Sequence, residues 1–369
     1  MTTLAALGSN GSGQLGIGHK EDVSVPKQVW DSPDLASSSP ITHVAAGGNH
    51  TLLLSDSGDL FWAGDSTSGA CGRVSAEQTA AKPQFHCVKL TDPSSDEPTT
   101  TFKVGLVAAT WEATIVTRLD PQGRNTSVYT FGAGTKGELG LGELIVRTPA
   151  PSRMAGFPPE GTEVVDLAAC MGHVVAVLGN GDVYGWGNGR KGQLGVPDAV
   201  VSSPRKITDV GFKVARAVCG KDFTVLVGGA DEPRVLFLGS DKWGIRDSLP
   251  ATAEDWRDVR ASWGNVYALR GEGALESWGR NDHGQMTPPG LPRISKIAVG
   301  SEHVLALDEE GNVLTWGWGE HGNCGPKVDD GDVKGRWNVI AFAKYLPPDC
   351  KVTSIGAGCA TSWIVVGHS

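Results

Sequence analysis

Three histidines at one position of a repeated turn are the first residues with potential chemistry. His50, His173 and His303 each end a small-residue turn, in the stretches GGNH, CMGH and GSEH. Three imidazoles could hold a metal ion or transfer protons. Their equivalence in the repeat instead predicts that each lies on its own structural unit, beside its own turn. We therefore expect each ring to hydrogen-bond to local backbone, and we predict no metal site.

The cysteines do not point to catalysis or metal binding either. There are seven, an odd number, and none forms a C-x-x-C pair, so neither a disulfide framework nor a zinc site is expected. Cys170, Cys219 and Cys359 fall in the small-residue turns, where we expect them to be buried as small apolar side chains. No Ser-His-Asp or Cys-His spacing indicates a nucleophile. The sequence therefore predicts a protein that is not an enzyme and has no cofactor.

A glycine-rich element recurs seven times and organises the chain. Each copy has the form Gly-x-x-x-x-Gly, and the first glycines are Gly8, Gly64, Gly132, Gly187, Gly239, Gly279 and Gly317. No copy has the Lys-Ser/Thr pair of a phosphate-binding loop or opens a helix. We therefore expect these glycines to supply positive φ angles in tight turns. The copies at Gly8 and Gly187 end in Gln-Leu-Gly and most others keep part of this ending, but the copy at Gly239 lacks it, which leaves its unit weakly defined.

Between the glycine elements the sequence predicts antiparallel hairpins. Short apolar runs such as 51–54 and 59–62 are joined by Ser-Gly or Asn-Gly turns, a pattern typical of β-hairpins. The first glycines are 56, 68, 55, 52, 40 and 38 residues apart, which suits a propeller blade of about four strands. The longest interval contains the polar stretch 73–101, which we interpret as a surface loop insertion. The predicted fold is all-β, a seven-bladed β-propeller.

The two ends of the chain are expected to complete one blade. The segment from Ile355 supplies a turn and a strand and stops before the next strand of the repeat. Residues 3–7, directly before the first glycine element, match that missing strand. We therefore expect residues 1–10 to pair with residues 350–369, which closes the ring and removes two unpaired sheet edges. Residues 1–369 would then form a single propeller.

Large apolar side chains precede the first glycine of most copies. They are Leu7, Phe131, Trp186, Leu238, Trp278 and Trp316. A large residue at the same place in successive repeats is what continuous burial between neighbouring units requires. We expect these six to pack between blades.

Other aromatic residues fall where loop tips are expected. In successive copies the residue before the second glycine is Ser12, Ser68, Lys136, Lys191, Trp243, His283 and His321. Because neighbouring strands alternate in direction, the glycine-element loops and the histidine-type turns must lie on one face. Trp and Arg are enriched at interface hot spots. The predicted partner-binding surface comprises Trp111, Trp243, Trp263, His283, Trp318, His321, Lys242 and Arg280. The alternative is that these side chains fold down over the blade ends.

Charge and hydropathy limit the possible partners. Lys and Arg number 32 and Asp and Glu 41, which gives a formal charge of −9. An acidic surface repels phosphate backbones, so direct DNA binding is not expected. No apolar run approaches the roughly 18 residues needed to span a bilayer, and the first residues do not form a signal peptide. We expect no membrane association and a location in the cytoplasm and nucleus.

The repeat motifs resemble those of the regulator-of-chromosome-condensation (RCC) repeat family of seven-bladed propellers. The shared motifs are G-x-x-H-T/V, the D/N-G turn, the aromatic-Gly step and G-x-x-x-x-G-Q-L-G, in order along almost the whole chain. Within that family, LAALGSNGSGQLGIGHKEDVSVPKQV and the GGNH at 47–50 resemble the fungal alpha-tubulin suppressor branch, also called killer-toxin-insensitivity proteins. The resemblance implies a scaffold that pairs with a small CSL-type zinc-finger protein. It also implies support for Elongator-dependent modification of wobble uridine in tRNA, with Elongator as a possible further partner, and for diphthamide formation on elongation factor 2.

Two other functions stay open. The same family includes guanine-nucleotide exchange factors for a small nuclear GTPase, which deform the nucleotide site of their partner and need no catalytic triad. A propeller hydrolase or lyase would act in the central channel and needs carboxylates or histidines that converge on the axis. We find no such cluster at equivalent positions of the inner strands, so the channel enzyme is the least favoured of the three.

Overall fold

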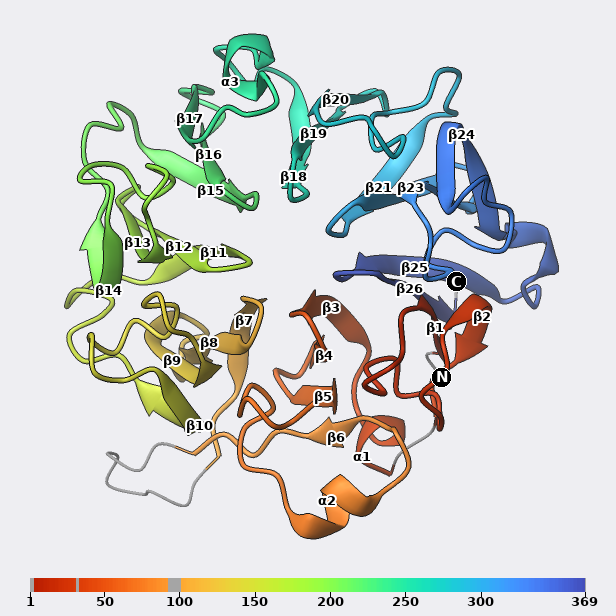
Figure 1. The fold of residues 1–369 in the computed structure, drawn as a ribbon, viewed down its shortest axis with the longest axis horizontal. Coiled ribbons are helices and arrows are strands. Elements are labelled where there is room, and N and C mark those ends of the chain that lie inside the picture. Colours follow the sequence, from red (N-terminus) through yellow and green to blue (C-terminus); the bar gives the residue numbers. More distant parts are fainter. Residues whose placement is uncertain (1–2, 31–32, 92–100, 369) are drawn as a thin grey trace.

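The computed structural model describes residues 3–30, 33–91 and 101–368. In these ranges seven antiparallel sheets stand around a common axis (Figure 1). Each sheet is one blade, and its strands lie side by side in order from the axis to the rim. The predicted all-β, seven-bladed propeller is confirmed.

Four blades follow the chain from the innermost strand outward with four strands each. Blade 1 contains β3 (Ile41–Ala46), β4 (His50–Ser55), β5 (Leu60–Gly64) and β6 (His86–Cys87). Blade 2 contains β7 (Val104–Ala109), β8 (Ala113–Leu119), β9 (Asn125–Ala133) and β10 (Arg147–Arg153). Blade 3 contains β11 (Val164–Cys170), β12 (His173–Leu178), β13 (Val183–Asn188) and β14 (Val200–Lys206). Blade 6 contains β21 (Ile294–Val299), β22 (His303–Asp308), β23 (Val313–Trp318) and β24 (Asp332–Ala341).

Blades 4 and 5 have three strands each in the described residues. Blade 4 contains β15 (Val214–Cys219), β16 (Phe223–Gly228) and β17 (Val235–Gly239). Blade 5 contains β18 (Trp256–Ala261), β19 (Asn265–Arg270) and β20 (Leu275–Gly279). In blade 4 the short helix α3 (Ile245–Ser248) follows the glycine element that lacks Gln-Leu-Gly, and no fourth strand forms. The weak sequence signal therefore corresponds to a real departure from the repeat.

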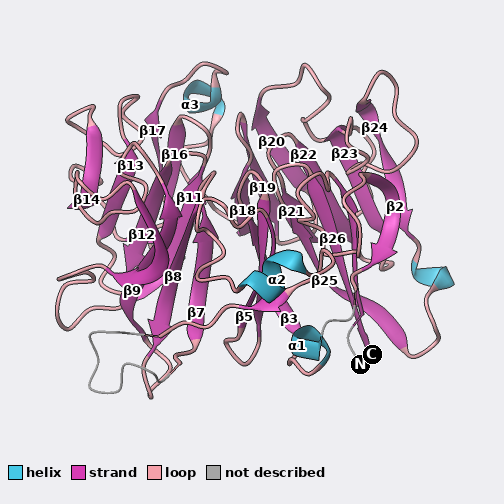
Figure 2. Ribbon diagram, turned by 60° about the horizontal axis from the view of Figure 1, so that its bottom comes forward, coloured by secondary structure: helices cyan, strands magenta, loops and turns pink. Residues whose placement is uncertain are grey.

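Blade 7 joins the two ends of the chain. Its strands, from the axis outward, are β25 (Cys350–Ala357), β26 (Thr361–His368), β1 (Thr3–Gly8) and β2 (Val23–Gln28). β1 pairs with β26 from Thr3 opposite Val366 to Gly8 opposite Thr361. The ring is thus closed as the sequence predicts, and β1 and β26, the first and last strands of the described chain, lie side by side (Figures 1 and 2).

The stretch 73–101, interpreted from the sequence as a surface loop insertion, contains regular structure. It includes α2 (Ala76–Ala80) and β6, the outer strand of blade 1. Phe85 in this stretch is fully buried, so part of the insertion contributes to the core. The polar residues 92–100 lie outside the described residues.

The remaining helices are small. They are α1 (Pro33–Ala36) and a 3-10 turn at Ala343–Tyr345. With four or five residues each, the α-helices of the described ranges are far shorter than a bilayer-spanning helix.

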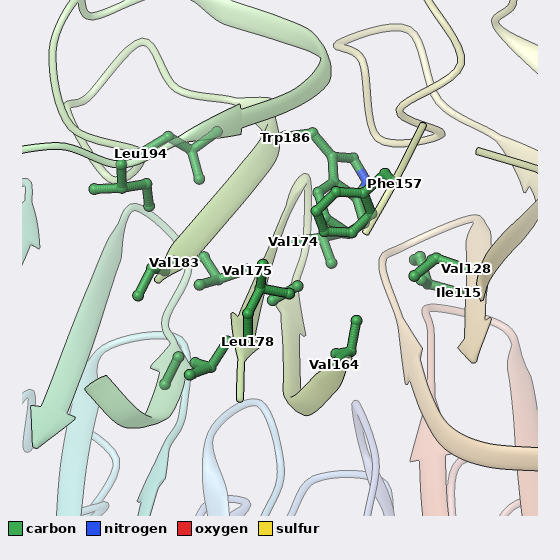
Figure 3. Close-up of a cluster of buried hydrophobic side chains, with 14 of the residues drawn as sticks. Ile115, Val128, Phe157, Val164, Val174, Val175, Leu178, Val183, Trp186 and Leu194 are labelled. Atoms are coloured by element: carbon green, nitrogen blue, oxygen red, sulfur yellow. The ribbon is translucent and has the colours of Figure 1, made fainter. Parts of the chain in front are cut away.

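The core lies between the blades. Figure 3 shows one cluster, in which Trp186 and Phe157 pack with valines and leucines of neighbouring sheets. Trp186 is fully buried, and its Nε1 donates a 3.0 Å hydrogen bond to the carbonyl of Glu138 in the preceding blade. The predicted inter-blade residues Leu7, Phe131, Trp186 and Trp316 are buried, and Leu238 and Trp278 are half-buried.

The glycine elements form tight turns with positive φ. Gly64 has φ +116°, and a Cβ there would collide with the carbonyl oxygen of Asn49 in the inner turn of the same blade. The first glycines of the other six copies share this conformation and this close approach. The structural role expected for these glycines is therefore confirmed.

Both kinds of loop meet on one face, which we call the turn face. In blade 1, Asp65 N of the glycine-element loop donates to Asn49 O of the inner turn at 2.8 Å. The same bond joins the two loops in the other blades, for example Ser9 to Ala360 in blade 7. The turn face therefore presents paired loops from every blade.

Candidate protein-binding surface

Trp243, Lys242 and Arg280 form one cluster on the turn face. Trp243 lies just before α3 and is 38 % exposed. The Arg280 guanidinium is 5.4 Å and the Lys242 ammonium 4.6 Å from its ring centroid, within range of a cation–π attraction. The indole Nε1 lies close above Gly264, in the inner turn of blade 5. The ring therefore rests on the neighbouring blade and still presents a face to solvent.

A buried carboxylate fixes Arg280 beside Trp243. Arg280 Nη1 donates to Glu302 Oε1 at 2.6 Å, and Nη2 donates to Asp282 Oδ2 at 2.7 Å. Glu302 is only 3 % exposed, and burial raises its pKa. Gln285 Nε2 donates to its second oxygen at 2.8 Å. Because a buried carboxylate is costly without a cation, Glu302 holds the guanidinium in place.

His283 forms the next group along the face. Its ring stacks on Trp318, with centroids 4.7 Å apart and planes 13° from parallel. Its Nδ1 lies 2.9 Å from Asp332 Oδ1 of β24. Gln285 Oε1 accepts a 3.0 Å bond from the His283 backbone N–H. Since Gln285 also bonds to Glu302, the His283 group and the Trp243 group share one network over blades 4, 5 and 6.

Trp111 and Trp263 meet at the axis. Their ring centroids are 6.0 Å apart and tilted by 46°. They belong to the inner turns of blades 2 and 5, which are not neighbours in the ring, so the pair lies across the mouth of the central channel. The Lys221 ammonium lies 5.5 Å from the Trp263 ring centroid. These two tryptophans mark the centre of the turn face.

His321 lies apart from these groups. Its Nδ1 is 3.0 Å from Asp22 Oδ2 in the first glycine-element loop, and about half of the side chain is exposed. This contact joins blades 6 and 7.

The structure thus brings five of the eight predicted residues into one network and places the other three elsewhere on the same face. The five are Trp243, Lys242, Arg280, His283 and Trp318. The sequence interpretation missed Glu302, Gln285, Asp282 and Asp332, which orient them. Gln285 had a signal, because it stands at the Gln position of the Gly-Gln-Leu-Gly motif, in the variant Gly-Gln-Met, and uses its Oε1 as Gln14 and Gln193 do. The acidic residues had none.

The three repeated histidines link blades instead of bonding to local backbone. His50, His173 and His303 each place Nε2 within 3.0–3.4 Å of a hydroxyl on the next blade; the partners are Thr114, Thr224 and Ser362. Burial lowers the pKa of each imidazole to about 4. The expected local partner was wrong. In the part of the chain that the structure describes, no group of three or more His, Cys, Asp or Glu residues is arranged to hold a metal ion.

The channel wall carries a polar row that the sequence interpretation did not describe. Seven residues before each histidine-type position, the inner strands carry one row of polar side chains: His43, Asp166, Arg216, Asp258, Lys296 and Ser354, with Leu106 in blade 2. Only His43, Asp166 and Asp258 of this row are histidines or carboxylates, and they belong to blades 1, 3 and 5. The sequence contained a signal for this row, because each of its residues lies seven positions before the histidine-type residue. The row is hard to recognise in the sequence because its residues differ in charge and size from blade to blade.

The closed ring of seven blades with paired loops defines the chain as a β-propeller of the repeat type. Residues 3–364 match the family model described as the RCC1-like domain. The chain belongs to this family.

Relatives with this domain differ in their described roles. The chain is 30 % identical over 377 residues to an RCC1 repeat-containing protein of Schizosaccharomyces pombe, with 98 % of each chain covered. It is 28 % identical over 309 residues to the bovine secretion-regulating guanine nucleotide exchange factor, covering 77 % of this chain and 61 % of that protein. The crystal structure of Prp20p from Saccharomyces cerevisiae matches with a TM-score of 0.79 at 20 % identity, covering 100 % of this chain and 92 % of that one. That structural match supports the fold alone.

Proposed function

We propose that this chain is a non-enzymatic binding scaffold and that the network around Trp243, Arg280 and His283 is its partner surface. The observation that carries the proposal is the Arg280–Glu302 pair beneath a half-exposed Trp243. Aromatic and Arg side chains held rigid before binding lose little conformational freedom on association. A surface ordered by buried partners is therefore well suited to hold another protein.

The proposed partner is a small CSL-type zinc-finger protein. This identity comes from the resemblance of the N-terminal repeat to the alpha-tubulin suppressor branch. The surface supports a small partner because it spans three blades and presents flat aromatic rings that buried neighbours hold in place. The complex would act in Elongator-dependent wobble-uridine modification and in diphthamide synthesis, in the cytoplasm and nucleus.

Calorimetry with the purified CSL-type protein from the same organism tests this proposal. We expect calorimetry to show one-to-one binding, and we expect the two proteins to elute together from a size-exclusion column at micromolar concentration. Trp243→Ala should weaken the binding at least tenfold, and the matched control Trp30→Ala, an exposed tryptophan outside the network, should leave it unchanged. Separate elution of the two wild-type proteins would contradict the proposal.

A second candidate function is guanine-nucleotide exchange on a small GTPase. It is favoured by the similarity to the bovine secretion-regulating guanine nucleotide exchange factor, which covers 77 % of this chain. An exchange factor of this type would also use a protein-binding face. The distinguishing measurement is release of a fluorescent guanine nucleotide from a nuclear GTPase. Acceleration by the chain of a hundredfold or more would place this function ahead of the scaffold.

A further inference from the structure

The central channel is a cavity of about 610 Å³ whose wall is unusual in one blade. Five residues before each histidine-type position, six blades have an uncharged small or medium residue in the cavity lining: Ala45, Ala108, Ala168, Val218, Ala298 and Gly356. Blade 5 has Arg260 at this position, and Arg260 also lines the cavity. Arg260 is therefore the one charged side chain at this position of the repeat.

Part of the Arg260 guanidinium has no protein partner. Its Nε donates to Asp258 Oδ2 at 3.1 Å, and Arg216 occupies the other oxygen, Asp258 Oδ1, at 3.1 Å. Among the described residues, no hydrogen bond is made by the two Nη atoms of Arg260. The side chain is 40 % exposed, and that exposure is to the channel. The two Nη groups form a planar pair of donors, the geometry that matches a carboxylate or phosphate.

The channel is roofed at the turn face by aromatic rings. Trp111 and Trp263 both line the cavity and meet across its mouth. Backbone hydrogen bonds tie their turns to neighbouring blades, as in Trp111 N to Met171 O at 2.8 Å and Trp263 N to Ser301 O at 3.0 Å. Below this roof the alanines give an apolar wall. Arg260 lies at the same level of the ring as these alanines, so a ligand beneath the roof would have flat apolar surface on one side and the Arg260 donors on the other.

The charge of the wall favours an anion. The described residues that line the cavity include four basic side chains, Arg216, Arg257, Arg260 and Lys296, against the two carboxylates of Asp166 and Asp258. This excess occurs in a chain with a formal charge of −9. Enclosure in the ring, reinforced by the Arg260 charge, lowers the pKa of His43 to about 4. The imidazole is therefore neutral near pH 7 and free to donate one hydrogen bond.

We propose that the central channel binds one organic anion with a phosphate or carboxylate head and a flat apolar body. The head lies on the Nη atoms of Arg260, and the body lies against the alanine wall beneath Trp111 and Trp263. The cavity volume is in the range of small-molecule sites. This site lies inside the ring and does not depend on the partner surface proposed above.

Calorimetric titration of the chain alone tests the channel site with four probes. Adenosine monophosphate carries a phosphate head, 2-naphthoate carries a carboxylate head, 2-naphthol supplies a neutral flat body, and inorganic phosphate supplies a head alone. We expect at least one of the two organic anions to bind one to one, at least tenfold tighter than the two partial probes. Which of the two binds identifies the head group.

Two variants and one control place the probe in the channel. Arg260→Ala should weaken the organic anion at least tenfold, and Asp258 keeps Arg216 as a partner in that variant. Ala168→Leu adds volume without changing charge and should also weaken the organic anion at least tenfold. Lys103→Ala, which removes an exposed cation paired with Asp59 outside the channel, should have no effect. Thermal melting of each variant confirms that it is folded.

Three results would overturn the channel site. They are failure of both organic anions to bind the folded wild-type chain, equal affinity of the wild type and Arg260→Ala, and unchanged binding by Ala168→Leu. Any of them would mean that the channel is only the space left at the centre of the ring.

Discussion

His283 stacks on Trp318 with ring centroids 4.7 Å apart, and Asp332 holds the imidazole from the side through Nδ1. Both rings are half-buried. Each ring therefore has one orientation before any partner arrives, which lowers the entropy lost on binding. Trp243 is also held in one orientation before binding, because its ring rests on Gly264 and lies beside the Arg280 guanidinium.

Partner affinity should depend on both tryptophans next to Gly264. We expect Trp243→Ala combined with Trp263→Ala to weaken the CSL-type protein more than Trp243→Ala alone, because Trp263 directly precedes Gly264, on which the Trp243 ring rests, and both tryptophans lie on the turn face. Calorimetry at constant salt measures the two affinities. If the double variant binds as tightly as wild type while its melting temperature is unchanged, the partner surface lies elsewhere.

Stability should fall in mildly acidic solution because of the inter-blade histidines. His50, His173 and His303 have pKa values of about 4 in the fold, below the 6.5 of an unfolded histidine. The unfolded chain therefore binds more protons between these values, and the free energy of unfolding decreases as pH falls from about 6.5 to about 4. Above about pH 6.5 the three histidines are neutral in both states, so protonation no longer lowers the free energy of unfolding. Urea denaturation across this range measures the slope.

Removing one titrating group isolates that slope. His173→Gln keeps a polar group opposite the Thr224 hydroxyl and cannot be protonated. It should reduce the pH dependence between 6.5 and 4 relative to wild type, whatever its effect on stability at pH 8. A slope equal to that of wild type would show that His173 is not a source of the acid sensitivity.

The first glycine of a glycine element should not tolerate a side chain. Gly64→Ala forces a Cβ against the Asn49 carbonyl at φ +116°, and we expect a loss of at least about 2 kcal/mol from backbone strain and the collision. Gly11→Ala is the matched control, because Gly11 has open space around it and a φ outside the left-handed region. Chemical denaturation compares the two. Equal stability would mean that the turn relaxes around a side chain.

Ring closure by β1 should be measurable as stability. Ala6 is fully buried and pairs with Trp363 of β26. Ala6→Asp places an unpaired carboxylate there, and we expect a loss of at least about 3 kcal/mol. Thr3→Asp, at an exposed position of the same strand, should cost less than about 0.5 kcal/mol. Similar denaturation midpoints for both variants would mean that β1 contributes little to the closed ring.

Much of the fold could be predicted because the repeat encodes it locally. Each first glycine marks the end of a third strand, so seven glycine elements indicate seven blades, and the strand before Gly8 could be matched to the gap after Ile355. The blade that departs from the motif, at Gly239, is also the one in which α3 replaces the fourth strand.

The contacts between blades could not be predicted in the same way. The partner of His173 is Thr224, a hydroxyl 51 residues away whose position depends on how two sheets pack. Glu302 likewise bonds to Arg280 from another blade. Arg260 differs from its repeat equivalents already in the sequence, but only the assembled ring shows that it lines the central cavity. The sequence indicates which loops share a face, and the packing of the sheets decides which side chains meet.

The pairing of β1 with β26 also means that blade 7 can be completed only after β26 has been synthesised. β1 is made before every other strand of the ring, yet the strand that covers its inner edge, residues 361–368, is made after all of them. At ordinary rates of translation the hairpin of β1 and β2 waits on the order of tens of seconds with one edge uncovered. Its short length and the lysine in β2 limit pairing with other nascent chains during that wait.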